Sequence, residues 1–180
     1  GWLQAPSPGM PFNQAMSLPL ELTLWPTSDG PRIAWRPVRE LRSLRQSSHE
    51  LGPRVIGPGA PNPLAKLSAE LVELRARFEA GAAAAITFNV RGVPVTYDLA
   101  KGEIEVGGHR AAAPLRDGRG NIAIYADRTA YEIFADDGMA YIPMPVIPKP
   151  EDRSLGLSVT GGEVRFETLE AHALRSIWGP

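Results

Sequence analysis

Three acidic side chains, Asp127, Glu132 and Asp136, lie near one another in the sequence and are the first candidates for chemistry. Two carboxyl groups that act together as nucleophile and general acid must lie about 5 to 5.5 Å apart. On an extended strand, residues five apart point to opposite faces, and residues four apart are separated by roughly 13 Å. The spacing therefore favours structural or turn-capping carboxylates, and we predict no catalytic residue among them.

The segment from Asp127 to Gly138 has the pattern of a strand that runs into a turn. Tyr131 and Ile133 fall on one side of this strand, and Glu132 and Phe134 fall on the other. The segment ends in Asp-Gly, which is a strong hairpin signal. Because Glu132 would share its face with apolar neighbours, we expect its carboxylate to find hydrogen-bond donors or to have a raised pKa.

The same segment resembles the signature of the C-terminal β-sandwich domain of glycoside hydrolase family 32, which includes levanases, inulinases and invertases. The resemblance assigns structural roles to five residues, here called the signature residues: Asp127, Arg128, Glu132, Phe134 and Gly138. It extends in the family's order over almost the whole chain. Residues 9–17 and 21–24 resemble the last part of the catalytic propeller, 37–41 the link between the two domains, and 175–178 the C-terminal end.

The resemblance implies a supporting role in a β-fructosidase that cleaves levan, inulin or sucrose. In this family the catalytic groups lie in Asn-Asp-Pro, Arg-Asp-Pro and Glu-Cys motifs of the propeller, and this chain contains none of the three. We therefore expect a piece that is inactive alone, with no cofactor, whose partner is the missing propeller domain. One departure is Pro19-Leu20-Glu21-Leu22, where the family commonly has Pro-Arg-Glu-Leu, and it affects the contacts expected of the propeller segment.

Composition narrows the alternatives. A formal net charge of -1 gives no reason to expect nucleic acid or an anionic membrane as partner. The absence of cysteine excludes disulfides and thiolate metal sites. No apolar run approaches the roughly 20 residues of a spanning helix, and no signal peptide is visible. The localisation stays open, although a secreted or periplasmic parent enzyme is compatible with the resemblance.

The chain divides into two parts near residue 50. Of the 18 prolines, 11 lie in the first 63 residues. We predict that residues 1–50 are the end of a propeller plus a linker helix, with a β-hairpin formed by 18–25 and 32–36 and a short helix over 38–45. Residues 51–180 are predicted to form the sandwich, and the Pro- and Gly-rich tract at 52–63 is predicted to be a linker or an irregular edge.

The stretch from Leu64 to Ala85 fits two patterns. As a helix, the stretch would place Leu64, Leu67, Leu71, Leu74 and Phe78 on one face. As a half-buried strand, it would alternate Val72, Leu74, Ala76 and Phe78 strictly with charged residues. Periodicity alone does not choose between these alternatives. The family resemblance favours a strand over 71–78, and we adopt it.

The remaining sequence predicts many short strands. Alternating apolar residues mark strands near 86–90, 93–97, 104–106, 122–124, 155–159 and 164–166, separated by glycine-containing turns. This spacing is typical of two stacked sheets or a barrel, and the resemblance favours an all-β, two-sheet antiparallel sandwich of the jelly-roll or concanavalin-like type. Prolines at 143, 145, 148 and 150 exclude a central strand, so 141–152 should be an edge or a crossover.

Other chemistry-bearing residues point to structural roles. His49, His109 and His172 lack metal-ligand spacing, so we predict no metal site. The arginines at 39, 42 and 45 form a helical stripe that we interpret as a solvated face. For the tryptophans at 2, 25, 35 and 178, burial at a domain contact is favoured over stacking on sugar rings.

Two alternatives to the supporting role remain. A free-standing fructan-binding module would use a face of the sandwich or exposed tryptophans, with Trp25 and Trp35 as the candidate carbohydrate contacts. An assembly module would use the unpaired edges of the hairpin at 18–36, which could recruit other chains or form a homodimer.

Overall fold

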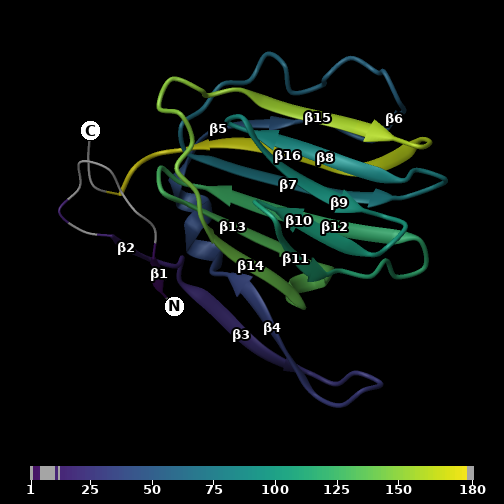
Figure 1. The fold of residues 1–180 in the computed structure, drawn as a ribbon, viewed down its shortest axis with the longest axis horizontal. Helices are drawn as coiled ribbons and strands as arrows, with labels where there is room; N and C mark the ends of the chain where they lie inside the picture. Colours follow the sequence, from purple (N-terminus) through teal and green to yellow (C-terminus); the bar gives the residue numbers. More distant parts are fainter. Residues whose placement is uncertain (1, 5–10, 12, 178–180) are drawn as a thin grey trace.

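The computed structural model describes residues 2–4, 11 and 13–177 and shows an antiparallel β-sandwich (Figure 1). The five-stranded sheet has the order β11-β10-β9-β8-β15. Its strands are β8 (Ala85–Val90), β9 (Val93–Asp98), β10 (Glu103–Val106), β11 (His109–Ala112) and β15 (Leu155–Thr160). The predicted fold class is therefore confirmed.

The seven-stranded sheet has the order β14-β13-β12-β7-β16-β5, and β6 pairs with β16 outside this path. Its strands are β5 (Arg45–Glu50), β6 (Arg54–Ile56), β7 (Val72–Glu79), β12 (Arg119–Ala126), β13 (Ala130–Ala135), β14 (Ala140–Pro145) and β16 (Val164–Leu174). The proline-containing β14 lies at the edge of this sheet, as the sequence predicted, because proline has no N–H for a second neighbour.

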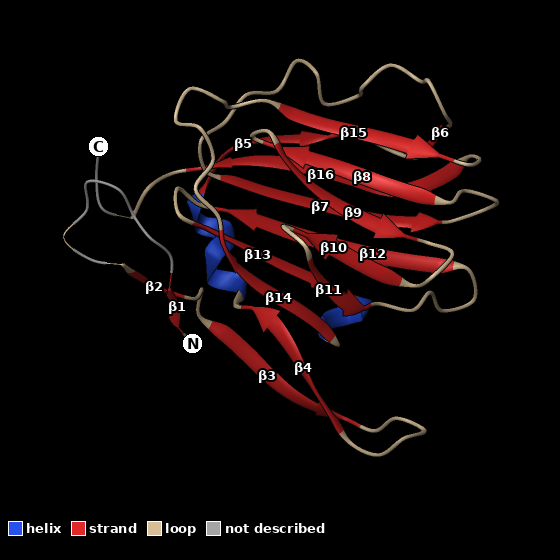
Figure 2. Ribbon diagram, viewed as in Figure 1, coloured by secondary structure: helices blue, strands red, loops and turns tan. Residues whose placement is uncertain are grey.

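Two small two-stranded sheets precede the sandwich. One joins β1 (Trp2–Gln4) to β2 (Gln14–Met16), and the other is the hairpin of β3 (Leu20–Trp25) and β4 (Arg32–Pro37). Figure 1 shows this hairpin extending away from the sandwich. Two short 3-10 helices, η1 (Arg39–Leu44) and η2 (Asp136–Gly138), are the helical segments of the described residues (Figure 2). The predicted hairpin and short helix are thus both present.

The main core lies between the two sheets. Strand β7 contributes Leu74, Ala76 and Phe78, and the ring of Phe78 meets Tyr97 of the opposite sheet edge to face at 5.5 Å. Burying these side chains requires period-two alternation, which a helix over this segment would not provide. The strand interpretation of residues 71–78 is therefore confirmed, and the helix alternative is wrong.

A second, smaller core covers the outer face of the seven-stranded sheet. It contains Leu41 of η1 together with Ala123, Tyr125 and Phe134 of the sheet, and Leu20 and Trp35 of the hairpin pack against it. The outer face of this sheet is therefore closed at one end by the N-terminal segment. This arrangement positions the residues described next.

Candidate functional site

The signature residue Glu132 joins the sheet to the N-terminal segment. Its side chain lies on the outer face of β13, and the residue is 4% exposed. It accepts hydrogen bonds from the Leu18 backbone N–H at 2.6 Å and from the Tyr141 hydroxyl at 2.5 Å. Burial raises the pKa of Glu132 above its ordinary value of 4.5, although both hydrogen bonds act in the opposite direction. The structure thus shows both features expected of this carboxylate.

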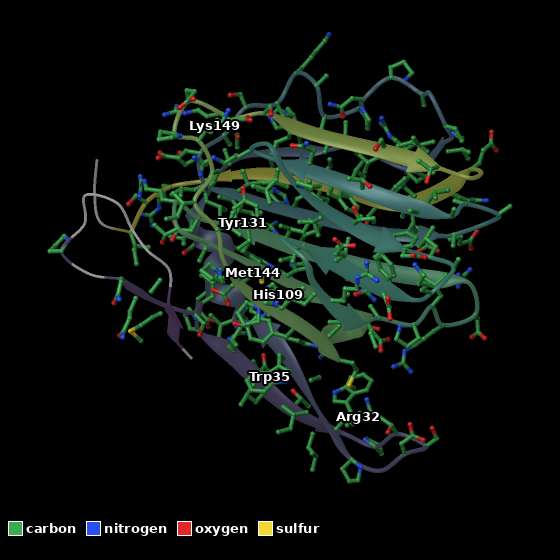
Figure 3. All side chains as sticks on the ribbon, viewed as in Figure 1. Arg32, Trp35, His109, Tyr131, Met144 and Lys149 are labelled. Carbon is green, nitrogen blue, oxygen red and sulfur yellow. The ribbon has the colours of Figure 1, made fainter. Side chains whose placement is uncertain are left out.

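An aromatic stack continues this junction. Phe134 packs face to face with Tyr141 at 4.8 Å, and Tyr141 packs on Trp35 of β4 at 5.7 Å. Figure 3 shows Trp35 on the hairpin, away from Tyr131 in the sandwich. Because one face of Trp35 is covered by Tyr141, this tryptophan lies at a contact between segments. The sequence did not predict that Tyr141 contacts Glu132 and Phe134, because this contact depends on the pairing of β13 with β14.

The turn η2, which follows β13, forms a second contact with the hairpin. A Cβ atom on Gly138 would lie 2.5 Å from the Trp35 carbonyl oxygen, so only glycine permits this approach. Arg36 Nε also donates to the Asp137 carbonyl at 3.1 Å. Three of the five signature residues, Glu132, Phe134 and Gly138, therefore belong to the surface on which the N-terminal segment packs.

The other two signature residues lie at the opposite end of β13. Arg128 forms an ion pair with Glu70, with Nε–Oε1 at 2.9 Å, and this hydrogen bond lowers the pKa of Glu70. The Asp127 carboxylate accepts from the Arg128 backbone N–H, and its carbonyl accepts from the buried Arg91. Asp127 and Arg128 therefore connect the loop before β13 to Arg91 and Glu70, and they do not contact the partners of Glu132.

A buried charge network lies on the same outer face. Glu73 is fully buried and accepts two hydrogen bonds from Arg45, at 2.6 and 2.7 Å, and a third from the Tyr125 hydroxyl at 2.9 Å. Burial would raise the pKa of Glu73, but these hydrogen bonds and the charges of Arg45 and Arg75 lower it overall. The interpretation of Arg45 as part of a solvated stripe is wrong, because pairing of β5 with β16 places it over Glu73. Arg39 and Arg42 are exposed, as expected.

The acidic candidates are not brought together as a pair. Glu132 binds Leu18 and Tyr141, whereas Asp136 is held by Arg116 through two hydrogen bonds, at 2.5 and 3.0 Å. His49 and His109 are exposed, and His172 is buried between Ser48 and Glu170. Across residues 2–4, 11 and 13–177 no group of three or more acidic or histidine side chains could hold a metal ion. Within that same part of the chain, no helix is long and apolar enough to cross a membrane.

The tryptophans differ in their surroundings. Trp25 is 40% exposed, and the Arg36 guanidinium lies 5.0 Å from its ring centre, which is a cation–π contact. Trp178, the side chain of Trp2, and Gly9, Met10 and Phe12 of the family-like segment lie outside the described residues. Carbohydrate contact by Trp25 or Trp35 stays a prediction.

The free end of the hairpin carries exposed apolar side chains. Leu22, Leu24 and Ile33, here called the hairpin stripe, are 55%, 68% and 47% exposed. Leu24 pairs with Ile33 and Leu22 with Trp35, so the stripe continues the partly buried row formed by Leu20 and Trp35. One apolar face of the hairpin is therefore covered by the sheet at its base and uncovered at its tip.

These features define a two-sheet sandwich module that contacts the base of a hairpin with one apolar face. The family model for the C-terminal region of glycosyl hydrolases family 32 matches residues 40–173. The chain belongs to this family.

Its similarities to individual proteins agree with this assignment. A levanase of Bacillus subtilis (strain 168) is 29% identical over 96% of this chain, and a levanase of Bacillus sp. (strain L7) is 25% identical over 91% of it. The chain spans only 29% and 20% of the lengths of these two relatives.

Solved structures share the fold. An exo-inulinase from Aspergillus awamori superposes over 96% of this chain and 38% of its own, with a TM-score of 0.76 and 19% identity. A β-fructofuranosidase from Schwanniomyces occidentalis superposes over 96% of this chain and 42% of its own, with a TM-score of 0.71 and 12% identity.

Proposed function

We propose that this chain is the non-catalytic C-terminal part of a levanase-like β-fructosidase, which hydrolyses levan, inulin or sucrose, and that it stabilises the catalytic propeller. The levanases to which it is similar are much longer than this chain, and the family's catalytic motifs are absent from its sequence. The propeller is the proposed partner, and the fructan or sucrose substrate is bound by the parent enzyme.

The observation that carries this proposal is the hairpin stripe. A contiguous exposed apolar surface is typical of a contact site, and a two-stranded sheet leaves both outer edges unpaired. The stripe continues directly from a buried junction, so the hairpin is held by the sandwich while its tip is free to pack elsewhere. These properties suit a segment that completes a neighbouring β domain.

We also propose a division of the chain near residue 50. Residues 1–50 would belong to the propeller and the linker, and residues 51–180 would form the sandwich. Strand β5 lies within the first part but pairs with β16, so it would fasten the linker to the sandwich. Glu73 would reinforce this connection through Arg45, the first residue of β5.

The experiment has two arms. The purified 180-residue chain should release no fructose from levan, inulin or sucrose, and turnover that survives removal of contaminating enzyme would contradict the proposal. The catalytic segment of the Bacillus subtilis levanase, produced without its own C-terminal region, should bind the chain and lose that binding on Leu24→Lys. Glu21→Lys places the same side chain on the opposite face of β3 and is the matched control. If both variants bound equally well, the hairpin stripe would not be part of the interface.

Two other functions are tested by the same material. A second copy could cover the hairpin stripe, and sedimentation showing a strict monomer would count against this assembly role. The exposed ring of Trp25 favours a carbohydrate-binding role, which predicts fructan binding that is lost on Trp25→Ala. Trp25→Ala is a cleaner test than Trp35→Ala, because Trp35 stacks on Tyr141.

A further inference from the structure

A hollow with a volume of about 240 Å³, lined by charged side chains and by Phe78, Pro114 and Gly120, lies where β7 and β12 meet the turn η2. Its charged lining consists of Arg77, Arg116, Arg119, Asp136, Asp137 and Glu167. Its size is slightly below that of pockets for drug-sized ligands, so it suits one small ring. Asp136, Asp137 and Arg116 of its lining make the structural contacts described above, but those contacts assign no ligand to the hollow.

The charges that line the hollow balance, because it has three arginines and three carboxylates. Arg116 pairs with Asp136 at 2.5 Å, and Arg77 pairs with Asp137 at 3.9 Å. Arg119 pairs with Glu167 at 3.7 Å and, more closely, with Glu79 outside the lining at 2.7 Å. An anion would meet three carboxylates there. A neutral ligand rich in hydroxyl groups fits better, because each hydroxyl can accept from a guanidinium and donate to a carboxylate.

The turn that forms one wall is strained. Asp136 and Asp137 have φ angles of 47° and 53°, which non-glycine residues rarely adopt. The Asp137 N–H donates to the Asn121 side chain at 3.2 Å, and Asp136 is clamped by Arg116. The surrounding groups thus hold these two residues in an unfavourable backbone conformation. Such backbone strain is often found at functional sites.

The hollow also lies beside the hairpin, because Arg36 of β4 donates to the Asp137 carbonyl at 3.1 Å. We propose that it binds one sugar unit of a β-fructan chain and so holds the polymer next to the catalytic domain. The identity of the sugar rests on the proposed function, whereas the neutral, hydroxyl-rich character of the ligand follows from the lining. Arg77 would be the main binding residue, since its ion pair is long, at 3.9 Å, whereas the equally exposed Arg116 and Arg119 are held in ion pairs at 2.5 and 2.7 Å.

The test is a titration of the 180-residue chain with short inulin and levan oligosaccharides, followed by NMR. Amide shifts should concentrate at Arg77, Asn121 and Asp137. Arg77→Ala should weaken binding about tenfold, the effect of losing hydrogen bonds from a charged group. Arg110→Ala is the matched control, because Arg110 is similarly exposed but pairs with Glu105 on the five-stranded sheet, and it should leave the affinity unchanged.

Several results would overturn the proposal. One is the absence of shifts at the hollow, and another is an Arg77→Ala variant that binds as the parent chain does. Competition by inorganic phosphate would identify an anion site instead, and equal binding of malto-oligosaccharides would remove the link to fructan. Arg77→Ala should not affect binding of the levanase catalytic segment, so failure of the proposed function is seen separately with Leu24→Lys.

Discussion

The backbone N–H of Leu18 donates to the carboxylate of Glu132 across 2.6 Å, joining residues 114 positions apart in the sequence. This bond lies at the base of the hairpin, where the N-terminal segment enters the outer core. The buried carboxylate thus fixes the direction in which the hairpin leaves the sandwich.

Replacing Glu132 tests this link. Glu132→Ala leaves the Leu18 N–H and the Tyr141 hydroxyl without their acceptor and should lower the free energy of unfolding by about 1–3 kcal/mol. Glu132→Gln keeps an acceptor oxygen and should cost less. Urea unfolding of the three proteins measures the difference, and an Ala variant as stable as the parent would exclude the anchoring role.

The pH dependence of the same group has a defined sign. Since burial raises the pKa of Glu132 in the folded state, its contribution to stability is fully present below the unfolded pKa of 4.5 and is lost as the pH rises through the folded pKa. The parent chain should therefore lose stability relative to Glu132→Gln between about pH 4 and about pH 7. Urea midpoints at the two pH values test this, and an unchanged difference would show that the carboxyl titrates alike in both states.

The contribution of Glu73 to stability should depend on pH in the opposite direction. Its pKa is lowered in the folded state, so its contribution is present above 4.5 and is lost as the pH falls through the folded pKa. Arg45→Met removes the main ion-pair partner of the buried Glu73 carboxylate. It should lower the free energy of unfolding by about 3–5 kcal/mol at neutral pH and by less in acid. Glu105→Gln breaks an exposed pair and should cost less than about 1 kcal/mol. Thermal unfolding would contradict this prediction if both variants were equally stable.

Arg91 should be essential for three loops. It is 3% exposed, and its guanidinium donates to the carbonyls of Asp152, Glu70 and Asp127 at 3.0, 3.0 and 3.4 Å. Arg91→Met should cost about 2–4 kcal/mol because these carbonyls lose their charged donor. Amide exchange should accelerate in all three loops. Arg128→Met removes a half-exposed ion pair with Glu70 and should have a small effect, and an equally large effect would contradict this account.

Gly138 should tolerate no side chain. Its φ angle is 95°, and an added Cβ would lie 2.5 Å from the Trp35 carbonyl oxygen. Gly108 has a φ of 81° with no atom within 4 Å of such a Cβ, so Gly108→Ala isolates the backbone cost, about 1–2 kcal/mol. Gly138→Ala should cost clearly more, and the near-ultraviolet circular dichroism of the Trp35–Tyr141 stack should change. Equal costs would show that the hairpin can move away from the turn.

The strands with alternating apolar residues could be predicted from the sequence. Strand β13 is one example, with Tyr131 and Ile133 in the main core and Phe134 in the outer core. Several strands were missed. Strands β1 and β2 were not predicted, and β6 lies within residues 52–63, which were predicted to be irregular. Strand β5 has the sequence Arg-Gln-Ser-Ser-His-Glu, and β11 has His-Arg-Ala-Ala. Neither β5 nor β11 shows apolar alternation, since each lies at a sheet edge and is ordered by backbone hydrogen bonds to one neighbour.

The sequence by itself determined the layered all-β architecture, the burial of Glu132 and the family resemblance, because period-two patterns and short motifs are local properties of the chain. Only the tertiary structure decided that Arg45 binds Glu73, that Glu132 receives Leu18, and that three arginines and three carboxylates surround one hollow. These groups are distant in sequence, and strand order and register bring them together. The hydrophobic pattern of a strand determines which side chains face the core, but it does not determine which distant strand becomes its neighbour.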